Sequence, residues 1–179
     1  HTVAVIRKKH EQAAYIALDS PAEVLMIPEN LSSEVLGLTF FEEFVRSYHQ
    51  EWATRIRQAG KYSCIHLDGT LKGLLRQECA LGLSFIEAMT PAPVGDLAIE
   101  EWPAWRGDSN TVFWGGIPGV YFTDLVDDAE FERHVKQVLA LMRTEPRYVL
   151  GVADQVPPDG LVRRIKRVRE LVDAFGRYE

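Results

Sequence analysis

The sequence predicts an α/β protein of the (β/α)8 TIM-barrel type, present as a partial barrel of about five βα units. Five short apolar runs alternate with segments of helical periodicity, and they begin near residues 24, 62, 84, 110 and 147. Strands that alternate with helices along a chain form a parallel sheet with right-handed crossovers. Polar residues close each run, and parallel α/β proteins keep their functional groups at these carboxyl ends. An open doubly wound sheet fits the same alternation, so two architectures stay open at this point.

The first half of the chain supplies a leading helix and two strand–helix units. Residues 1–20 carry small and apolar side chains at helical spacing, and Pro21 ends that helix. Thr39 and Glu42 have the spacing of a capping box, which predicts the start of the next helix. The remaining elements expected in this half are a strand over 24–27 with a polar tip at 28–30, a helix over 41–56, a strand over 62–65 and a helix over 71–75.

The second half repeats the alternation three more times. Pro103 is expected to end a short helix around residues 97–105, and Asp127 with Glu130 predicts the cap of a longer one. The other expected elements are strands over 84–86, 111–114 and 147–153 and helices over 131–142 and 161–175.

Composition excludes several classes of protein. The chain has 179 residues with 20 basic and 26 acidic side chains, so its net charge is −6. This acidic balance argues against a nucleic-acid-binding module. No apolar run approaches the roughly 18 residues that cross a membrane, and no secretory leader is visible. The two cysteines, Cys64 and Cys79, lack metal-ligand spacing, which indicates a cytoplasmic protein.

No linker or repeat divides the sequence, so we expect one domain over residues 1–179, with βα units over 24–178. A closed barrel needs eight strands and about 250 residues, whereas five strands are expected here. The chain also opens without methionine and inside a helical pattern. We therefore expect roughly three N-terminal βα units to be absent from this chain or to be supplied by a second copy in a homo-oligomer.

Polar residues at the five strand ends are the candidate functional groups. They are Glu29 and Asn30, His66 and Asp68, Glu87 and Thr90, Gly115 and Gly116, and Asp154 and Gln155. His66 and Asp68 are the most informative, because positions i and i+2 of an extended segment project to the same side. An imidazole and a carboxylate on one face can bind a divalent metal or form an oriented general base. Asp154 is the best candidate for a third member.

Whether Asp154 can join His66 depends on how the sheet curves. Asp154 lies three strands after His66, so a flat sheet would separate the two strands by roughly 14 Å, at about 4.8 Å per strand. Metal–ligand bonds are about 2 Å long, so a flat sheet cannot bring both side chains to one ion. A barrel turns them toward a common axis. A three-residue site therefore requires the barrel architecture.

Four motifs at these strand ends resemble the C-terminal half of the uroporphyrinogen decarboxylase superfamily. They are HLDG at 66–69, EAMTPAPVGD at 87–96, GGIPG at 115–119 and DQVPP at 154–158, and the resemblance covers about residues 24–178. Members of this superfamily are β/α barrels that decarboxylate uroporphyrinogen or move methyl groups in corrinoid systems. In the methyltransferase branch, a His-x-Cys pair and a distant cysteine bind zinc, which activates a thiol acceptor.

Carried over to this chain, the resemblance implies a modified metal centre. His66 matches the zinc histidine, while Asp68 and Asp154 stand where the two cysteines would be. Carboxylates in place of thiolates give a harder, oxygen-rich site, for which zinc is the first candidate and other divalent ions are alternatives. In the decarboxylase branch a histidine matches Asp154, and the arginine-rich substrate motif lies N-terminal to the region matched here.

The leading hypothesis is an enzyme of this superfamily that catalyses methyl transfer or demethylation in a corrinoid-linked system. His66, Asp68 and Asp154 then hold a divalent metal or act as an acid/base cluster, with a small-molecule substrate and a corrinoid protein as partners. A second hypothesis is decarboxylation of a tetrapyrrole, in which Asp154 stabilises positive charge on the ring. A third is a catalytically silent half-barrel that serves as a binding or assembly module.

The remaining polar residues at the strand ends are candidate substrate contacts. Glu29 is a candidate for a fourth ligand or a substrate contact, and the other contacts expected are Asn30, Glu87, Thr90, Gln155 and Gly116. Turn formation before Pro91 explains Thr90 equally well, and tight packing explains the glycines.

Several conspicuous side chains are expected to be structural. The histidines on predicted helices, which we expect to be solvated or partly buried, are His10, His49 and His134. Core packing is expected for Cys64 and for the tryptophans Trp52, Trp102, Trp105 and Trp114. A solvated face of the last helix is expected for Arg163, Arg164, Lys166, Arg167 and Arg169.

Overall fold

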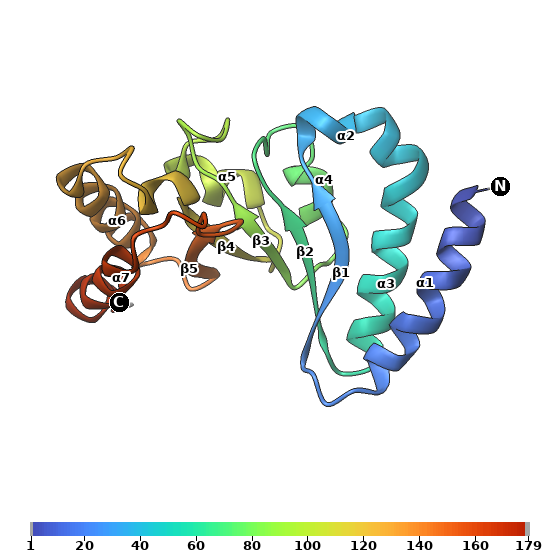
Figure 1. The fold of residues 1–179 in the computed structure, drawn as a ribbon. Coiled ribbons are helices and arrows are strands. Elements are labelled where there is room, and N and C mark those ends of the chain that lie inside the picture. The colour runs from blue at the N-terminus through green and yellow to red at the C-terminus, as the bar shows by residue number, and fades with distance from the viewer. Residues whose placement is uncertain (1, 178–179) are drawn as a thin grey trace.

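The computed structural model describes residues 2–177, which form one five-stranded parallel sheet covered by helices (Figure 1). Each strand pairs with the next strand along the chain, in the order β1-β2-β3-β4-β5. The strands are β1 (Val24–Leu31), β2 (Tyr62–Leu67), β3 (Phe85–Met89), β4 (Val112–Pro118) and β5 (Tyr148–Ala153). This arrangement confirms the predicted α/β fold and agrees with a partial barrel.

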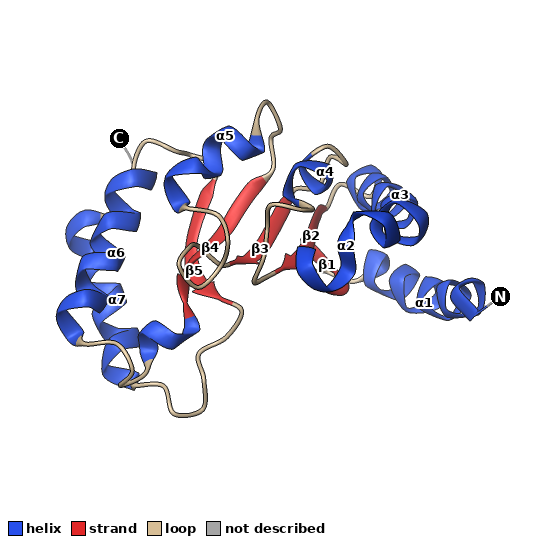
Figure 2. Cartoon of the chain, turned by 90° about the horizontal axis from the view of Figure 1, so that it is seen from above, coloured by secondary structure: helices blue, strands red, loops and turns tan. Residues whose placement is uncertain are grey.

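Helices connect the strands and cover the sheet. The longer ones are α1 (Thr2–Asp19), α3 (Arg46–Gln58), α6 (Asp128–Met142) and α7 (Val162–Phe175). The shorter ones are α2 (Ser33–Phe40), α4 (Leu75–Cys79) and α5 (Trp102–Arg106), with a π-helical turn over Phe41–Val45 and 3-10 turns over Ile99–Glu101 and Gly119–Phe122. Seen from above, α1 and α3 lie at the β1 end of the sheet and α6 and α7 at the β5 end (Figure 2). Within residues 2–177, no helix combines the length and apolarity that a bilayer span requires.

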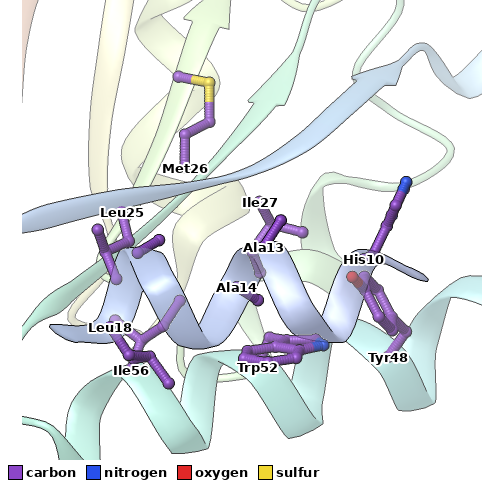
Figure 3. Close-up of a pocket in the computed structure, with 11 residues that line it drawn as sticks. His10, Ala13, Ala14, Leu18, Leu25, Met26, Ile27, Tyr48, Trp52 and Ile56 are labelled. Carbon is purple, nitrogen blue, oxygen red and sulfur yellow. The ribbon is translucent and has the colours of Figure 1, made fainter. Parts of the chain in front are cut away.

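The two faces of the sheet differ in burial. On β4, Phe113 is buried on the helix-covered face, whereas its neighbour Trp114 is partly exposed on the opposite face. On β1, Leu25 and Ile27 are buried, whereas Met26 between them is half exposed and points away from α1 (Figure 3). Side chains alternate across a strand, so the core packs between the sheet and the helices, and the second face stays open.

The leading helix is confirmed as α1, which begins at Thr2. Residue 1 and residues 178–179, where the predicted domain starts and ends, lie outside the described part of the chain. Ala14, Ala17 and Leu18 of α1 pack against the core, although no residue of this helix is fully buried. An apolar cavity of about 210 Å³ lies between α1, α3 and β1 (Figure 3). None of the candidate residues at the strand ends lines this cavity.

One predicted helix boundary is wrong, one lies close to the observed position, and one predicted cap is confirmed. α2 begins after Ser32 but is broken at Gly37, whose backbone is not helical, so the helix expected to start near Thr39 starts directly after Gly37 and Thr39 lies in its first turn. Pro103 does not end α5 but lies in its first turn, where its missing N–H would have no intrahelical partner. The side chain of Asp127 caps α6 by accepting a hydrogen bond from the Glu130 backbone N–H.

Three side chains depart from the predicted pattern of burial. His49 on α3 is fully buried, because two glutamates bind its ring. Arg164 on α7 is buried rather than solvated, because its guanidinium donates to three backbone carbonyls of the segment before α6. Trp114 is partly exposed rather than part of the core. Residues buried as predicted are Trp52, Trp102 and Cys64, and burial raises the pKa of the Cys64 thiol to about 12.

Candidate metal centre

His66, Asp68 and Asp154 converge at the carboxyl ends of β2 and β5. One ligand atom of each residue lies within 4.8 Å of the others, and His66 Nε2 is 3.8 Å from Asp154 Oδ1. A flat sheet would hold these two strands roughly 14 Å apart. The sheet therefore curves toward its open face, which is concave. This curvature brings together the three residues that the sequence pattern singles out.

Strand alternation aims His66 at the concave face. Its neighbours Ile65 and Leu67 are fully buried toward the helices, so the imidazole projects to the other side. Asp68 is the first residue after β2. Its backbone N–H donates to Leu31 O at 2.9 Å, which fixes the end of β2 against β1. The His66 side chain keeps 16% of its surface exposed. The ring is therefore held firmly but remains reachable from solvent.

Backbone strain coincides with the site. Among residues 2–177, the non-glycine residues with positive φ are Ala88 and Asp154, each at 65°. A non-glycine residue with this left-handed backbone costs of order 1 kcal/mol. Such a conformation therefore persists only where the surrounding structure holds it. The left-handed backbone at Asp154 turns its carboxylate toward His66. Ala88, the second strained residue, directly follows Glu87 in the chain. No feature of the sequence predicts the left-handed backbone at either position.

Glu87 binds the histidine directly. Its carboxylate accepts a hydrogen bond from His66 Nδ1 at 2.5 Å, and the two residues are register partners on β3 and β2. With the proton held at Nδ1, Nε2 is the nitrogen that faces Asp154. Metal-binding histidines are commonly oriented by a carboxylate on their second nitrogen. The geometry therefore gives Glu87 the position of an orienting group for His66.

Glu29 belongs to a different cluster. Its carboxylate accepts a hydrogen bond from His49 Nε2 at 2.9 Å, and His49 Nδ1 bonds Glu78 at 2.9 Å on the helix-covered side of the sheet. Burial alone would lower the pKa of His49, but the hydrogen bonds to Glu29 and Glu78 outweigh it and raise the pKa to about 9. Glu29 is not a member of the His66 group. Helical periodicity gave no signal of this cluster, because its three members come from three separate elements.

The other predicted substrate contacts are not drawn into the group. Thr90 is buried, and its hydroxyl bonds the loop after β2 and the backbone of β3. A side chain at Gly116 would overlap the Tyr148 hydroxyl, so packing alone requires this glycine. Asn30 and Gln155 are exposed at the strand ends. The substrate-binding roles of these residues stay predictions.

The strand ends are acidic. No lysine or arginine occurs in the segments 28–31, 66–70, 87–90, 115–119 and 153–156. Asp68, Glu87 and Asp154 instead surround the single imidazole of His66. A cleft lined by one sign of charge concentrates ligands of the opposite sign. The strand ends around His66 therefore favour cations.

The donor set fits a divalent ion. Imidazole nitrogen and carboxylate oxygen bind zinc at about 2.0–2.2 Å, so two such bonds span up to about 4.2 Å. The 3.8 Å between His66 Nε2 and Asp154 Oδ1 is too long for a hydrogen bond and lies within that span. Since carboxylates outnumber the imidazole, harder ions such as manganese suit the set as well as zinc.

Comparisons with known proteins address the fold and the family. The family model "Uroporphyrinogen decarboxylase (URO-D)" matches residues 11–175. A solved methyltransferase from Methanosarcina mazei has a similar fold, with a TM-score of 0.71 at 16% sequence identity. The match covers 92% of this chain and 47% of that one, so the chain spans about half the length of that methyltransferase. No curated protein matches the chain.

Proposed function

The chain belongs to the uroporphyrinogen decarboxylase (URO-D) family, and we propose that it is an enzyme of methyl transfer or demethylation in a corrinoid-linked system. In this proposal His66, Asp68 and Asp154 hold a divalent ion, with zinc the first candidate. A small molecule is the substrate, and a corrinoid protein is the partner. The convergence of these three residues within 4.8 Å is the observation that carries the proposal.

In this proposal the side chains of the protein bind the ion and orient one another around it. A bound divalent ion supplies Lewis acidity, which favours the thiolate form of a coordinated thiol acceptor. Glu87 keeps the His66 proton at Nδ1, so that Nε2 is free to bind the ion. The left-handed backbone at Asp154 turns its carboxylate toward the same point. Without an ion, the same imidazole and carboxylates can act as an acid/base cluster.

The charge of the strand ends supports methyl transfer over tetrapyrrole decarboxylation. A substrate with several acidic side chains needs cationic groups to bind it, and the strand-end segments contain no lysine or arginine. Asp68, Glu87 and Asp154 would repel such a substrate. The neighbour of similar fold is named a methyltransferase, which supports the same choice.

The test is methyl transfer from methylcobalamin to a thiol, followed by the change in corrinoid absorbance. We expect turnover by the zinc-loaded protein, loss after treatment with EDTA, recovery when zinc is restored, and loss in Asp154→Asn. Glu43→Gln is the matched control, because Glu43 is an exposed carboxylate on the π-helical turn. Turnover that survives both EDTA and Asp154→Asn would contradict the metal centre. Failure to bind either an ion or a corrinoid would favour the silent half-barrel.

A further inference from the structure

Trp114 lies on the concave face rather than in the core. Its neighbour Phe113 packs edge-to-face against Trp102 of α5, with 6.2 Å between ring centroids. Strand alternation therefore places Trp114 on the opposite side of β4. Trp114 is 39% exposed, whereas Trp52 and Trp102 are 4% and 1% exposed. The indole thus presents surface to the open side of the sheet.

Strand register sets Trp114 beside the candidate metal centre. His66 pairs with Glu87 across β2 and β3. The register between β3 and β4 shifts between the pairs Ile86–Phe113 and Met89–Gly115, so Trp114 lies opposite the two residues Glu87 and Ala88. Both chain neighbours of Glu87 are fully buried, so Glu87 projects to the concave face, as His66 and Trp114 do. Neighbouring strands are about 4.8 Å apart. The three side chains therefore form one row on the concave face.

The indole of Trp114 packs against the backbone of Gly151 on β5. A Cβ atom on Gly151 would overlap Trp114 Nε1 and Cδ1, so the ring lies directly against this backbone. Gly151 pairs with Gly116, which is two residues beyond Trp114 on β4, so the ring leans toward the carboxyl ends of the strands. Asp154 follows three residues after Gly151. The indole therefore lies over β5, three residues before Asp154 in the chain and on the same face of the sheet as Glu87.

An exposed indole beside carboxylates is suited to an organic cation. The face of the indole ring carries negative charge density and attracts ammonium groups within about 6 Å of its centroid. Asp68, Glu87 and Asp154 carry three negative charges, of which a divalent ion at His66, Asp68 and Asp154 would offset two, so one negative charge remains. The strand-end segments contain no basic residue that would offset it. A neutral aromatic ring would stack on the indole but would gain nothing from these carboxylates.

We propose that Trp114 is a platform that binds an alkylammonium group of the substrate beside His66, Asp68 and Asp154. This inference deepens the proposed function, on which it rests for the identity of the site, by naming a cationic class of substrate. Trp114 sets specificity through the indole face, and the carboxylates balance the charge of the ligand. Gly151 is required because any side chain at that position would displace the ring.

The test uses choline as the probe and 3,3-dimethyl-1-butanol as its neutral carbon isostere. Binding is followed by the NMR shift of the Trp114 indole N–H at constant ionic strength. We expect choline to shift this signal saturably and the isostere to bind about 5-fold or more weakly, in keeping with known cation–π strengths. Equal binding of the two probes would overturn the proposal, because the platform would then select apolar shape and not charge.

Two substitutions separate the platform from a structural tryptophan. Trp114→Leu should weaken choline binding by about 5-fold or more, measured by calorimetry, while Trp114→Phe should retain part of it. Gly151→Ala keeps the indole but displaces it from the backbone of residue 151, so choline binding should also fall. Trp105→Leu is the matched control, because Trp105 is partly buried next to Arg76. Unchanged choline affinity in Trp114→Leu would overturn the proposal.

The same titration distinguishes this inference from the proposed function. Choline binding is measured in wild-type protein with zinc, in wild-type protein with EDTA, and in His66→Ala. Choline binding that persists in EDTA and in His66→Ala, in a protein that binds no ion, would retain the platform and overturn the metal centre. Ion binding through His66 without choline binding would retain the metal centre and overturn the platform.

Discussion

Among residues 2–177, His49 and His66 each have carboxylates facing both ring nitrogens, and the two histidines differ in solvent access. His49 has Glu78 on one ring nitrogen and Glu29 on the other, each at 2.9 Å. The side chains of His49 and Glu78 are fully buried. Both ring nitrogens are satisfied, so this cluster is closed and its groups stabilise the fold.

The second histidine, His66, has one satisfied nitrogen and one open nitrogen. Nδ1 bonds Glu87, whereas Nε2 stays 3.8 Å from Asp154, whose side chain is 46% exposed. The same chemical groups therefore serve stability in one cluster and a proposed function in the other, according to one distance and to solvent access. The buried cluster cannot accept a ligand, and the strand-end cluster has room for one.

Removing His49 should have the largest effect on stability. In His49→Ala the buried Glu78 carboxylate loses its partner, and breaking a buried pair in this way costs about 3–5 kcal/mol. His66→Ala should lower the free energy of unfolding by less than about 1 kcal/mol, because Asp154 and Glu87 remain partly solvated. Urea denaturation of both variants measures the difference. Equal losses in the two variants would remove the distinction between the clusters.

Alkaline pH should weaken the closed cluster. The pKa of His49 is raised from 6.5 to about 9, so the folded protein binds this proton more tightly than the unfolded chain does. The resulting stabilisation is complete below about pH 6.5 and is lost as the pH rises through about 9, by about 3 kcal/mol. Equilibrium unfolding between pH 6 and pH 10 should show this loss, and His49→Gln should flatten the profile. A flat profile in the wild-type protein would show that His49 is not charged.

The open cluster should respond to a change that leaves stability nearly unaltered. In Glu87→Gln the orienting carboxylate of His66 is replaced by an amide, which should lower the affinity for zinc by about 10- to 100-fold. Calorimetric titration measures the affinity, with Glu43→Gln as the exposed control. Zinc affinity that is equal in both variants would show that Glu87 does not orient the histidine.

Much of the fold could be predicted, because burial against helices leaves a direct mark on the sequence. Apolar runs located all five strands, and Asp127 marked the start of α6. The polar stretch after Ile27 hid the continuation of β1 to Leu31, where the register with β2 becomes irregular. The spacing of Thr39 and Glu42 located a helix start to within about two residues, but the break at Gly37 that sets this start was not predicted.

The candidate site could be predicted in part. His66, Asp68 and Asp154 followed from motif spacing and from the curvature that a barrel demands. The contact of Glu87 with His66 depends on strand register, which the sequence pattern does not determine. The burial of His49 depends on Glu78, which lies 29 residues later on another helix. The sequence predicts Trp114 as a core residue, because the face that each side chain of β4 occupies depends on where the strand begins, which the sequence pattern does not show.

The most direct test of the metal centre is the number of divalent ions bound per chain, measured by mass spectrometry of the metal content after loading and gel filtration. We predict about one ion per chain in the wild-type protein and in His10→Ala, whose histidine is exposed on α1. We predict none in His66→Ala. An equal ion content in His66→Ala and His10→Ala would contradict the assignment of the site to the ends of β2 and β5.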